Sequence, residues 1–380
     1  MMKKILFYID SLILGGEQKL AIDYIRLLCK NYKLQILINM DFGNDNFFLS
    51  KIPSNLPISF VIEKNLIETL NFYRKNRKNS IKNRILYSYY LYKKRRARLH
   101  NLPSIIKSLD YDFCIDFSNK LPPALTDERV LVWNHSSLEG TSEKTINNFL
   151  KPKYKKNKYI IVVSESMKLE YLKAFPEFQK KIKVVPNFID IQEIEKKSLK
   201  TIPEKTSFFL CCSRLDPKKD ISTIIRAFSL WKKNKEHYEK LFILGSGVYQ
   251  NNLETLSKSL DLENDVVFLG QKENPYPYMK QAKLFLHASL QEGFGLVLVE
   301  AMACKTPVIS TDCPVGPKEI LENGTYGILI PMKDENSLYR AIQKIMENES
   351  IYLDYQAKAY QRAHDFSKEN VLMRLTPLLF

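Results

Sequence analysis

Short apolar runs alternate with amphipathic stretches along most of the chain. An apolar run at residues 3–9 is followed by a glycine-containing loop, a helical pattern at 17–30 and a second apolar run at 34–40. A strand, a loop, a helix and a strand in this order predict a βαβ unit, and hence a parallel α/β architecture. Further strands of this half are expected at 113–117, 130–133 and 159–163.

The same rhythm begins again at Ser207. Strands are expected at 207–212, 241–244, 266–269, 284–289, 307–311 and 327–330. Helices are expected at 220–233, 250–260, 275–282, 296–304 and 335–347. Strands that are each followed by a helix are typical of a doubly wound parallel sheet. The pattern therefore predicts two α/β halves with a cleft between them.

The domain boundaries follow from this pattern, and a length of 380 residues agrees with two domains. We predict an N-terminal Rossmann-like, acceptor-binding domain at 1–190 and a C-terminal Rossmann-like, donor-binding domain at 206–365. The polar, Lys- and Glu-rich residues 191–205 between them are expected to be a linker. Residues 366–380 are expected as a C-terminal helix that could pack back on the N-terminal domain.

Cysteine usage and hydropathy bear on the compartment. The six cysteines form no CxxC pair, which argues against a zinc ribbon or a disulfide scaffold and favours a reducing compartment. The first apolar run stops at Asp10, which is too short for a signal peptide, and no window has the length of a membrane span. A cytoplasmic protein is therefore expected.

The formal net charge of +16 implies an anionic partner. Residues 74–98 contain eleven Lys or Arg and no acid, interleaved with tyrosines and aliphatic residues. One interpretation is a solvated basic face. The other is a helix that docks on anionic lipid and offers a lipid-linked or phosphorylated acceptor to the site, which would make the protein peripheral on the inner face of the membrane.

The densest chemical pattern is a glycine-rich loop between an expected strand and an expected helix. It contains Glu292 and leads into a helix that carries Glu300. Backbone N–H groups at such a helix start can face an anion, and a carboxylate can accept hydrogen bonds from vicinal sugar hydroxyls. On spacing alone, an ordinary turn beside a surface glutamate is an equally good interpretation.

Two cations follow another expected strand. Arg214 and Lys219 lie five residues apart, so they can converge on a diphosphate, whereas a solvated basic turn is the simpler alternative. Lys218 is expected to be a surface residue. The pair Gly15-Gly16 opens the first helix and permits close approach of a phosphate or sugar. A histidine, His135, follows the strand at 130–133.

These motifs resemble the retaining GT-B glycosyltransferases of glycosyltransferase family 4. Glu292 and Glu300 match the Glu-x7-Glu pattern of that family, and the segments 307–310 and 312–321 are also similar to it. The likeness is greatest to bacterial members that build lipopolysaccharide, capsule or lipid-linked glycans. It is strongest over residues 207–332 and thinner over 1–190.

The resemblance implies transfer of a hexose or N-acetylhexosamine from a nucleotide diphosphate sugar, with a UDP-sugar as the expected donor, to a glycan or lipid-linked acceptor. It assigns Glu292 to the donor sugar and Glu300 to the ribose hydroxyls. Arg214 and Lys219 match the Arg-Leu-x3-Lys motif that binds the diphosphate. The remaining residues that it assigns, each toward the donor, are Gly15, Gly16, His135 (catalytic, near the sugar), Gln271 (nucleobase), and the backbone of Phe294, Gly295 and Leu296.

The chain departs from the family pattern at several positions. Residues 17–19, Ser213 and Asp220 differ from the residues that are usual there. Lys305 stands where relatives usually have glycine, and a left-handed conformation there would cost on the order of 1 kcal/mol.

No His, Asp or Glu cluster has metal-ligand spacing and no Asp-x-Asp occurs. We therefore expect a reaction without metal or other cofactor. Two other classes stay open: a GT-B-shaped nucleotide-sugar epimerase and a basic nucleic-acid-binding protein. The second lacks any RRM, KH or zinc-finger signature.

Overall fold

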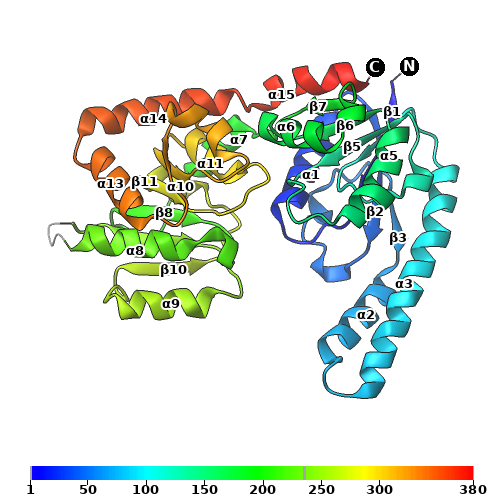
Figure 1. The fold of residues 1–380 in the computed structure, drawn as a ribbon, viewed down its shortest axis with the longest axis horizontal. Helices are drawn as coiled ribbons and strands as arrows, with labels where there is room; N and C mark the ends of the chain where they lie inside the picture. Colours follow the sequence, from blue (N-terminus) through cyan, green and yellow to red (C-terminus); the bar gives the residue numbers. More distant parts are fainter. Residues whose placement is uncertain (1, 234–236, 380) are drawn as a thin grey trace. The chain divides into compact units, whose positions relative to one another are not determined.

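The computed structural model describes residues 2–233 and 237–379, which form two compact units (Figure 1). The N-terminal unit consists of Met1–Val162, Tyr171–Lys183 and Leu378–Phe380, and the C-terminal unit consists of Val163–Glu170 and Val184–Pro377. None of the helices among the described residues combines the length and apolar character needed to cross a membrane.

The N-terminal unit is built on a seven-stranded sheet of order β3-β2-β1-β4-β5-β6-β7, in which the pairs from β3 to β6 are parallel. Its strands are β1 (Lys4–Ile9), β2 (Lys33–Met40), β3 (Ile58–Ile62), β4 (Phe113–Asp116), β5 (Val130–Asn134), β6 (Tyr159–Val162) and β7 (Ile182–Val184). Its helices are α1 (Gly16–Leu28), α2 (Lys64–Asn76), α3 (Ile81–Ser108), α4 (Glu143–Thr145), α5 (Lys151–Lys156) and α6 (Glu165–Ala174), the last of which contributes residues to both units.

The C-terminal unit is built on a six-stranded parallel sheet of order β10-β9-β8-β11-β12-β13. Its strands are β8 (Phe208–Cys212), β9 (Lys240–Leu244), β10 (Val266–Gly270), β11 (Leu284–His287), β12 (Val308–Thr311) and β13 (Ile328–Ile330). Its helices are α7 (Ile191–Ser198), α8 (Ile221–Lys232), α9 (Gln250–Ser259), α10 (Tyr276–Gln281), α11 (Leu296–Ala303), α12 (Pro317–Ile320), α13 (Glu335–Met346), α14 (Glu349–His364) and α15 (Lys368–Leu375).

Both sheets reverse their strand order next to their first strand. The reversal lies between β1 and β4 in one unit and between β8 and β11 in the other. In open parallel sheets the loops that leave the carboxyl ends of the strands at this point form the ligand site. The expected pair of doubly wound sheets is thus confirmed, and the fold locates one candidate site in each unit.

The segment 191–205 is not simply a linker. Its first eight residues form α7, which packs on α10 and α11 and buries Ile191 and Ile194. Asp190 caps α7 by accepting from the backbone N–H of Glu193 (3.1 Å). The polar composition that suggested a linker belongs to the outer face of a short amphipathic helix.

The basic stretch 74–98 is two helices rather than one. It covers the end of α2, a turn, and the first part of the 28-residue α3. The two helices pack as a hairpin in which the rings of Tyr73 and Tyr90 stack with centroids 5.3 Å apart. Ser80 caps α3 through the backbone N–H of Asn83 (3.1 Å), which is the local reason why the helix begins anew.

The start of α15 is fastened within the C-terminal unit. Ile189 forms an isolated parallel bridge with Ser367, and the ammonium of Lys368 lies 2.7 Å from the carboxylate of Asp190. Only the last residues, from Leu378, group with the N-terminal unit.

Candidate active site

In the C-terminal unit, the loop that follows β8 and the loop that follows β11 are joined by hydrogen bonds. The backbone N–H of Leu290 donates to the carbonyl of Lys218 (2.8 Å), and the Lys218 ammonium donates to the side-chain carbonyl of Gln291 (3.0 Å). Lys218, expected to be merely a surface residue, is exposed but holds these two loops together. The motifs around Arg214 and Glu292 therefore lie together at the point of strand reversal.

A compact charged group stands at the junction of these loops. The ammonium of Lys219 pairs with Oε1 of Glu292, and Nε2 of His287 lies 2.9 Å from the same oxygen. Because a carboxylate only accepts, Nε2 carries a proton. The other ring nitrogen of His287 lies 3.0 Å from the hydroxyl of Ser310 on β12, so the imidazole is held from both sides.

The environment of Glu292 keeps it ionised. Burial alone would raise its pKa, but the hydrogen bond from His287 and the charge of Lys219 outweigh burial and lower the pKa to about 2. The side chain is 12% exposed, so this carboxylate is oriented before any ligand binds. An oriented anion of this kind can accept hydrogen bonds from sugar hydroxyls or stabilise a developing positive charge.

Arg214 differs from Lys219. It is exposed on the loop directly after β8, whereas the Lys219 side chain is only 17% exposed. Close packing of backbones shapes this loop. A Cβ on Gly245 would lie 1.9 Å from the carbonyl oxygen of Ser213, and one on Gly247 would lie 2.2 Å from that of Leu215. Both glycines follow β9, so the loop after β9 lies directly against the loop that carries Arg214.

Glu300 lies on α11 and is only 8% exposed. Tyr276, at the start of α10, donates its hydroxyl proton to Glu300 at 3.1 Å. The helix begins after Gly295, whose φ of 93° lies in the left-handed region. A Cβ on Gly316 would lie 2.0 Å from the carbonyl oxygen of Phe294, so close packing fixes the backbone that precedes Leu296.

Gln271 is exposed at the carboxyl end of β10, directly after Gly270, whose φ is 66°. The carbonyl of Gly270 accepts from the backbone N–H of Gly245 (2.9 Å). Gln271 thus lies at the same edge of the sheet as Arg214 and Glu292, two strands away from β8.

In the N-terminal unit, Gly15 and Gly16 follow β1 and begin α1. Neither needs to be glycine for backbone reasons, since the φ of Gly15 is 179° and a Cβ on Gly16 would meet nothing within 4 Å. A Cβ on Gly15 would meet only the amide end of the Gln18 side chain. Open space therefore lies beside Gly16, and only the end of the Gln18 side chain lies beside Gly15.

His135 lines a pocket of about 320 Å³ at the carboxyl ends of β1, β4 and β5. Its Nε2 lies 2.9 Å from the carbonyl of Phe117, which can only accept, so Nε2 carries the proton. Burial lowers the pKa of His135 to about 4, and the hydrogen bond to Phe117 opposes this only in part. The neutral imidazole leaves Nδ1 as an acceptor. The other residues that line the pocket are Asp10, Glu17, Gln18, Ser118, Asn119, Lys120, Trp133, Asn134, Ser136, Ser137, Leu138, Thr141, Thr145, Phe149, Leu150 and Tyr171.

Comparison with known proteins identifies the family. The family described as glycosyl transferases group 1 matches residues 191–363. The N-acetylgalactosamine-N,N'-diacetylbacillosaminyl-diphospho-undecaprenol 4-alpha-N-acetylgalactosaminyltransferase of Campylobacter jejuni is 34% identical over 62% of this chain and 63% of its own length. An uncharacterised glycosyltransferase of Methanocaldococcus jannaschii is 30% identical over 67% of this chain and 72% of its own. The chain is a glycosyltransferase of this family.

Two solved structures share the fold of this glycosyltransferase. HepE of Anabaena, crystallised with UDP and glucose, matches with a TM-score of 0.74 at 19% identity over 99% of both chains. TarM of Staphylococcus aureus, crystallised as a mutant with UDP among its ligands, matches with a TM-score of 0.73 at 16% identity over both whole chains. Two Rossmann-like units in one chain are the GT-B fold, as expected.

Sequence reasoning about this glycosyltransferase missed His287 and Tyr276, which hold the two glutamates. His287 lies within the predicted strand 284–289, five residues before Glu292, and a polar residue in that apolar run was the available signal. Tyr276 carries no local signal, because its role depends on elements that meet only in the fold. Among the described residues, no group of three His, Cys, Asp or Glu could hold a metal ion.

Proposed function

We propose that the chain is a retaining glycosyltransferase that moves a hexose or N-acetylhexosamine from a UDP-sugar to a glycan or lipid-linked acceptor in the assembly of bacterial surface polysaccharide. The observation that carries the proposal is the group formed by Lys219, Glu292 and His287 at the strand reversal of the C-terminal sheet. The relative in Campylobacter is named for a diphospho-undecaprenol acceptor, and HepE was crystallised with UDP and glucose, which supports the acceptor and donor classes.

The cations take the diphosphate. Arg214 offers a planar, bidentate donor from an exposed loop, and Lys219 offers a point charge. Lys219 pairs with Glu292, so a bound diphosphate would share this ammonium with the carboxylate. Both positive charges stabilise the leaving UDP. They take the place of a metal ion, so the reaction needs none.

Glu292 accepts hydrogen bonds from the donor sugar and stabilises the oxocarbenium-like transition state. Glu300 accepts from the ribose hydroxyls, with Tyr276 fixing its carboxylate. The backbone of Phe294 to Leu296 faces the sugar and phosphate, and the backbone at Gln271 faces the nucleobase. These roles are carried over from the family motifs. Their support is that the residues lie at one edge of the C-terminal sheet.

In the N-terminal unit, Gly15 and Gly16 leave room for the donor, and His135 accepts a hydrogen bond from the donor sugar through Nδ1. The bond between the anomeric carbon and the diphosphate oxygen breaks while the acceptor oxygen bonds to the same face of that carbon. The acceptor proton passes to the departing phosphate oxygen. No separate general base is then required.

A panel of UDP-sugars tests the proposal, with UDP release measured in the presence and absence of an undecaprenyl diphosphate-linked saccharide. Arg214→Ala and Glu292→Gln are each expected to lower kcat about 100-fold, the usual loss for one transition-state donor or charge. Arg226→Ala on the exposed face of α8 is the matched control and should retain the wild-type rate. The product should keep the anomeric configuration of the donor, and EDTA should leave the rate intact. Full activity of Arg214→Ala or Glu292→Gln would refute these assignments.

We further propose that the α2–α3 hairpin docks on an anionic membrane surface, with the protein peripheral on the inner face of the membrane. Ile81, Ile85, Tyr89 and Tyr92 of α3 are 71, 64, 47 and 60% exposed. Their spacing of four, four and three residues places them along one face of the helix.

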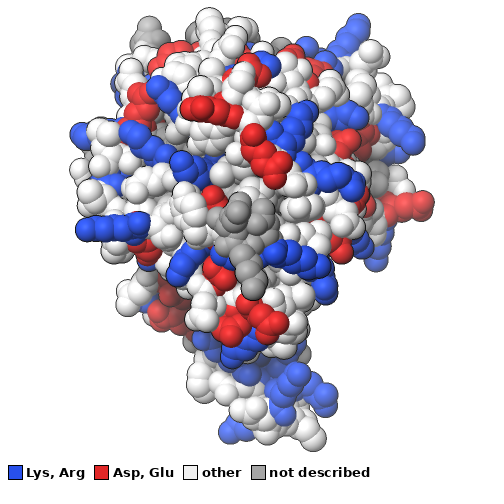
Figure 2. Space-filling view, turned by 90° about the vertical axis from the view of Figure 1, so that its left-hand side faces the viewer, with Lys and Arg blue, Asp and Glu red and all other residues white. Residues whose placement is uncertain are grey.

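Cations border this apolar stripe. By the same helical geometry, Arg84 and Arg95 lie on one side of the stripe and Lys82 and Lys93 on the other. Figure 2 shows blue side chains among white ones at the end of this hairpin, which Figure 1 labels as α2 and α3. An exposed apolar stripe with basic flanks is the pattern of helices that lie in the membrane interface. This arrangement favours docking over a merely solvated face.

A further inference from the structure

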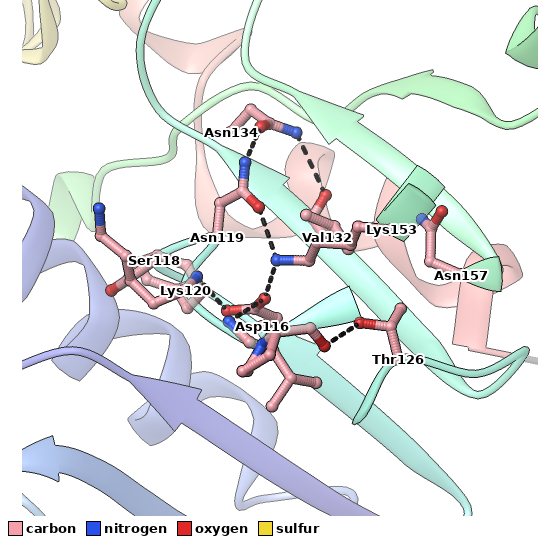
Figure 3. Close-up of polar contacts among 12 residues, drawn as sticks. Asp116, Ser118, Asn119, Lys120, Thr126, Val132, Asn134, Lys153 and Asn157 are labelled. Carbon is pink, nitrogen blue, oxygen red and sulfur yellow. Dashed lines mark hydrogen bonds and ion pairs between the residues drawn. The ribbon is translucent and has the colours of Figure 1, made fainter. Parts of the chain in front are cut away.

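A fully buried ion pair lies at the carboxyl end of β4 (Figure 3). The ammonium of Lys153 on α5 lies 2.5 Å from the carboxylate of Asp116, and both side chains are 0% exposed. Neither residue has a role in the function proposed above. Lys153 does not line the pocket of the N-terminal unit, but its partners lead directly to it.

Hydrogen bonds extend from this pair to the next strand. Lys153 also donates to the side-chain carbonyl of Asn119 at 2.6 Å. The amide nitrogen of Asn119 donates to Asn134 at the end of β5 (2.7 Å), and the hydroxyl of Tyr154 donates to the same oxygen (2.9 Å). Figure 3 shows Asn119 between Lys153 and Asn134.

Asp116 fastens the backbone of the same loop. Its two carboxylate oxygens accept from the backbone N–H groups of Lys120 (3.0 Å) and Leu121 (2.9 Å). Asn119 has a φ of 52°, in the left-handed region that residues other than glycine rarely adopt. The loop 117–121 is thus held in an uncommon backbone conformation by one buried carboxylate and one buried ammonium.

Stability alone is a poor explanation of this pair. Desolvation of two charges offsets most of their attraction, and apolar replacements of similar volume are often equally stable. The loop that the pair holds does have a second consequence. It supplies Ser118, Asn119 and Lys120 to the pocket wall, and its Phe117 carbonyl accepts from His135.

We propose that Lys153 is a positioning residue for acceptor recognition. Through Asn119 and Asp116 it sets the shape of loop 117–121. This loop places the exposed Lys120, and the Ser118 hydroxyl that donates to Glu17, in the wall of the pocket that would take the hydroxyl-rich sugar end of the acceptor. This inference rests on the proposed function and on the expectation from the sequence that the N-terminal unit binds the acceptor. The nucleotide, bound by the C-terminal unit, does not depend on Lys153.

The double variant Asp116→Asn with Lys153→Met tests this proposal, because it removes both charges and leaves none buried alone. The double variant should fold and bind UDP with a Kd within twofold of wild type by calorimetry. Its KM for the undecaprenyl diphosphate-linked saccharide should rise at least tenfold. Lys181→Met is the matched control, because Lys181 donates to three backbone carbonyls at the carboxyl end of α5 and is not among the residues that line the pocket. This variant should lose stability but keep the acceptor KM.

A second readout separates this inference from the proposed function. Hydrogen exchange at the amides of 118–121 should accelerate at least tenfold in the double variant and stay unchanged in Lys181→Met. An acceptor KM within twofold of wild type, or a loss of UDP affinity as large as the change in acceptor KM, would overturn the positioning role. If wild type transfers no sugar from any UDP donor, the proposed function fails. Hydrogen exchange at 118–121 that is the same in the double variant as in wild type would overturn the ordering of the loop by Lys153.

Discussion

His135 shows how one residue's surroundings can couple protonation to stability. Its pKa is lowered to about 4 by burial, against about 6.5 in an unfolded chain. Between these values the unfolded state binds more protons than the folded state. Stability contributed by the neutral ring is therefore complete above pH 6.5 and is lost as the pH falls toward 4.

We predict that His135→Gln flattens the fall in melting temperature between pH 6.5 and 4, because glutamine can still donate to the Phe117 carbonyl but does not titrate. In wild type, the loss of unfolding free energy that comes from His135 over this pH range is on the order of a few kcal/mol. Thermal unfolding followed by circular dichroism at a series of pH values measures it. His100→Gln, at an exposed position on α3, should keep the wild-type slope. A His135→Gln curve that parallels wild type would show that this ring does not titrate as described.

The backbone conformation of a single residue could be foreseen from the sequence where it depends mainly on that position. Lys305 follows the last residues of α11 with a φ of 64°, so the left-handed conformation that was considered for a position where relatives have glycine is the one present. Its ammonium lies 4.5 Å from the centroid of the Tyr360 ring, a contact worth about 0.5–1 kcal/mol that offsets much of the backbone cost. The sequence could not show this compensation, because Tyr360 lies on α14.

At the scale of elements, the start of α11 depends on how closely α12 approaches it. Gly316 and Gly324 have nearly the same φ, 98° and 99°, but only Gly316 lies against a backbone carbonyl, that of Phe294. We predict that Gly324→Ala costs about 1 kcal/mol of unfolding free energy from backbone strain alone. Gly316→Ala should cost at least about 2 kcal/mol more, because the backbone at Phe294 must move.

Chemical denaturation of both variants checks this difference, and UDP titration checks its consequence for the site. UDP affinity should fall at least tenfold in Gly316→Ala and remain at the wild-type value in Gly324→Ala. Equal behaviour of the two variants would mean that the loop before α11 tolerates displacement.

The α2–α3 hairpin yields a separate prediction. Wild type should sediment with vesicles that contain phosphatidylglycerol and not with phosphatidylcholine vesicles. Ile85→Ser with Tyr92→Ser removes apolar contact, and Arg84→Gln with Arg95→Gln removes about 1 kcal/mol per charge, so either pair should weaken binding at least tenfold. Leu353→Ser, at a 54% exposed position on α14, is the control and should bind like wild type. Binding that ignores lipid charge would exclude the docking surface.

Helices and strands with a clear amphipathic or apolar pattern were predicted, and those with a short or weak pattern were missed. The strands from β8 to β13 lie within two residues of their expected ends. By contrast, β3 and β7, with helices α2 and α6, were not predicted. The sheet-edge strand β7 has three residues, too few for a periodic signal. The charged side chains of α2 obscured its apolar face, which buries only Ile67 and Leu70.

For the whole molecule, charge is concentrated rather than spread. Residues 74–98 hold eleven cations and no acid, so the rest of the chain carries +16 − 11 = +5. Composition alone could not distinguish a basic surface from one basic element. Since exposed charges are screened over about 8–10 Å at physiological salt, docking by the many exposed cations of this hairpin should be far more sensitive to salt than binding of UDP by Arg214, which is exposed, and Lys219, which is 17% exposed.

The two tryptophans of the chain provide one reporter for each unit. Trp133 lies on β5 of the N-terminal unit and Trp231 on α8 of the C-terminal unit. Because the proposed nucleotide site belongs to the C-terminal unit, UDP at 100 times its Kd should stabilise that unit by about 2.7 kcal/mol and raise its melting temperature by about 5–10 °C. The fluorescence of Trp133→Phe, which retains Trp231, should report this shift in full.

The complementary variant Trp231→Phe, which retains Trp133, should report the acid sensitivity that comes from His135. At constant UDP, the thermal midpoint of Trp231→Phe should fall as the pH drops from 6.5 to 4. This fall should be larger than the fall measured with Trp133→Phe, in which Trp231 is the reporter. If UDP shifted only the transition seen by Trp133, the nucleotide would bind to the N-terminal unit, and the roles proposed for Arg214, Lys219 and Glu300 would be wrong. Equal shifts at both reporters would instead mean that the two units unfold as one cooperative body, so that the free energy of UDP binding stabilises the whole chain.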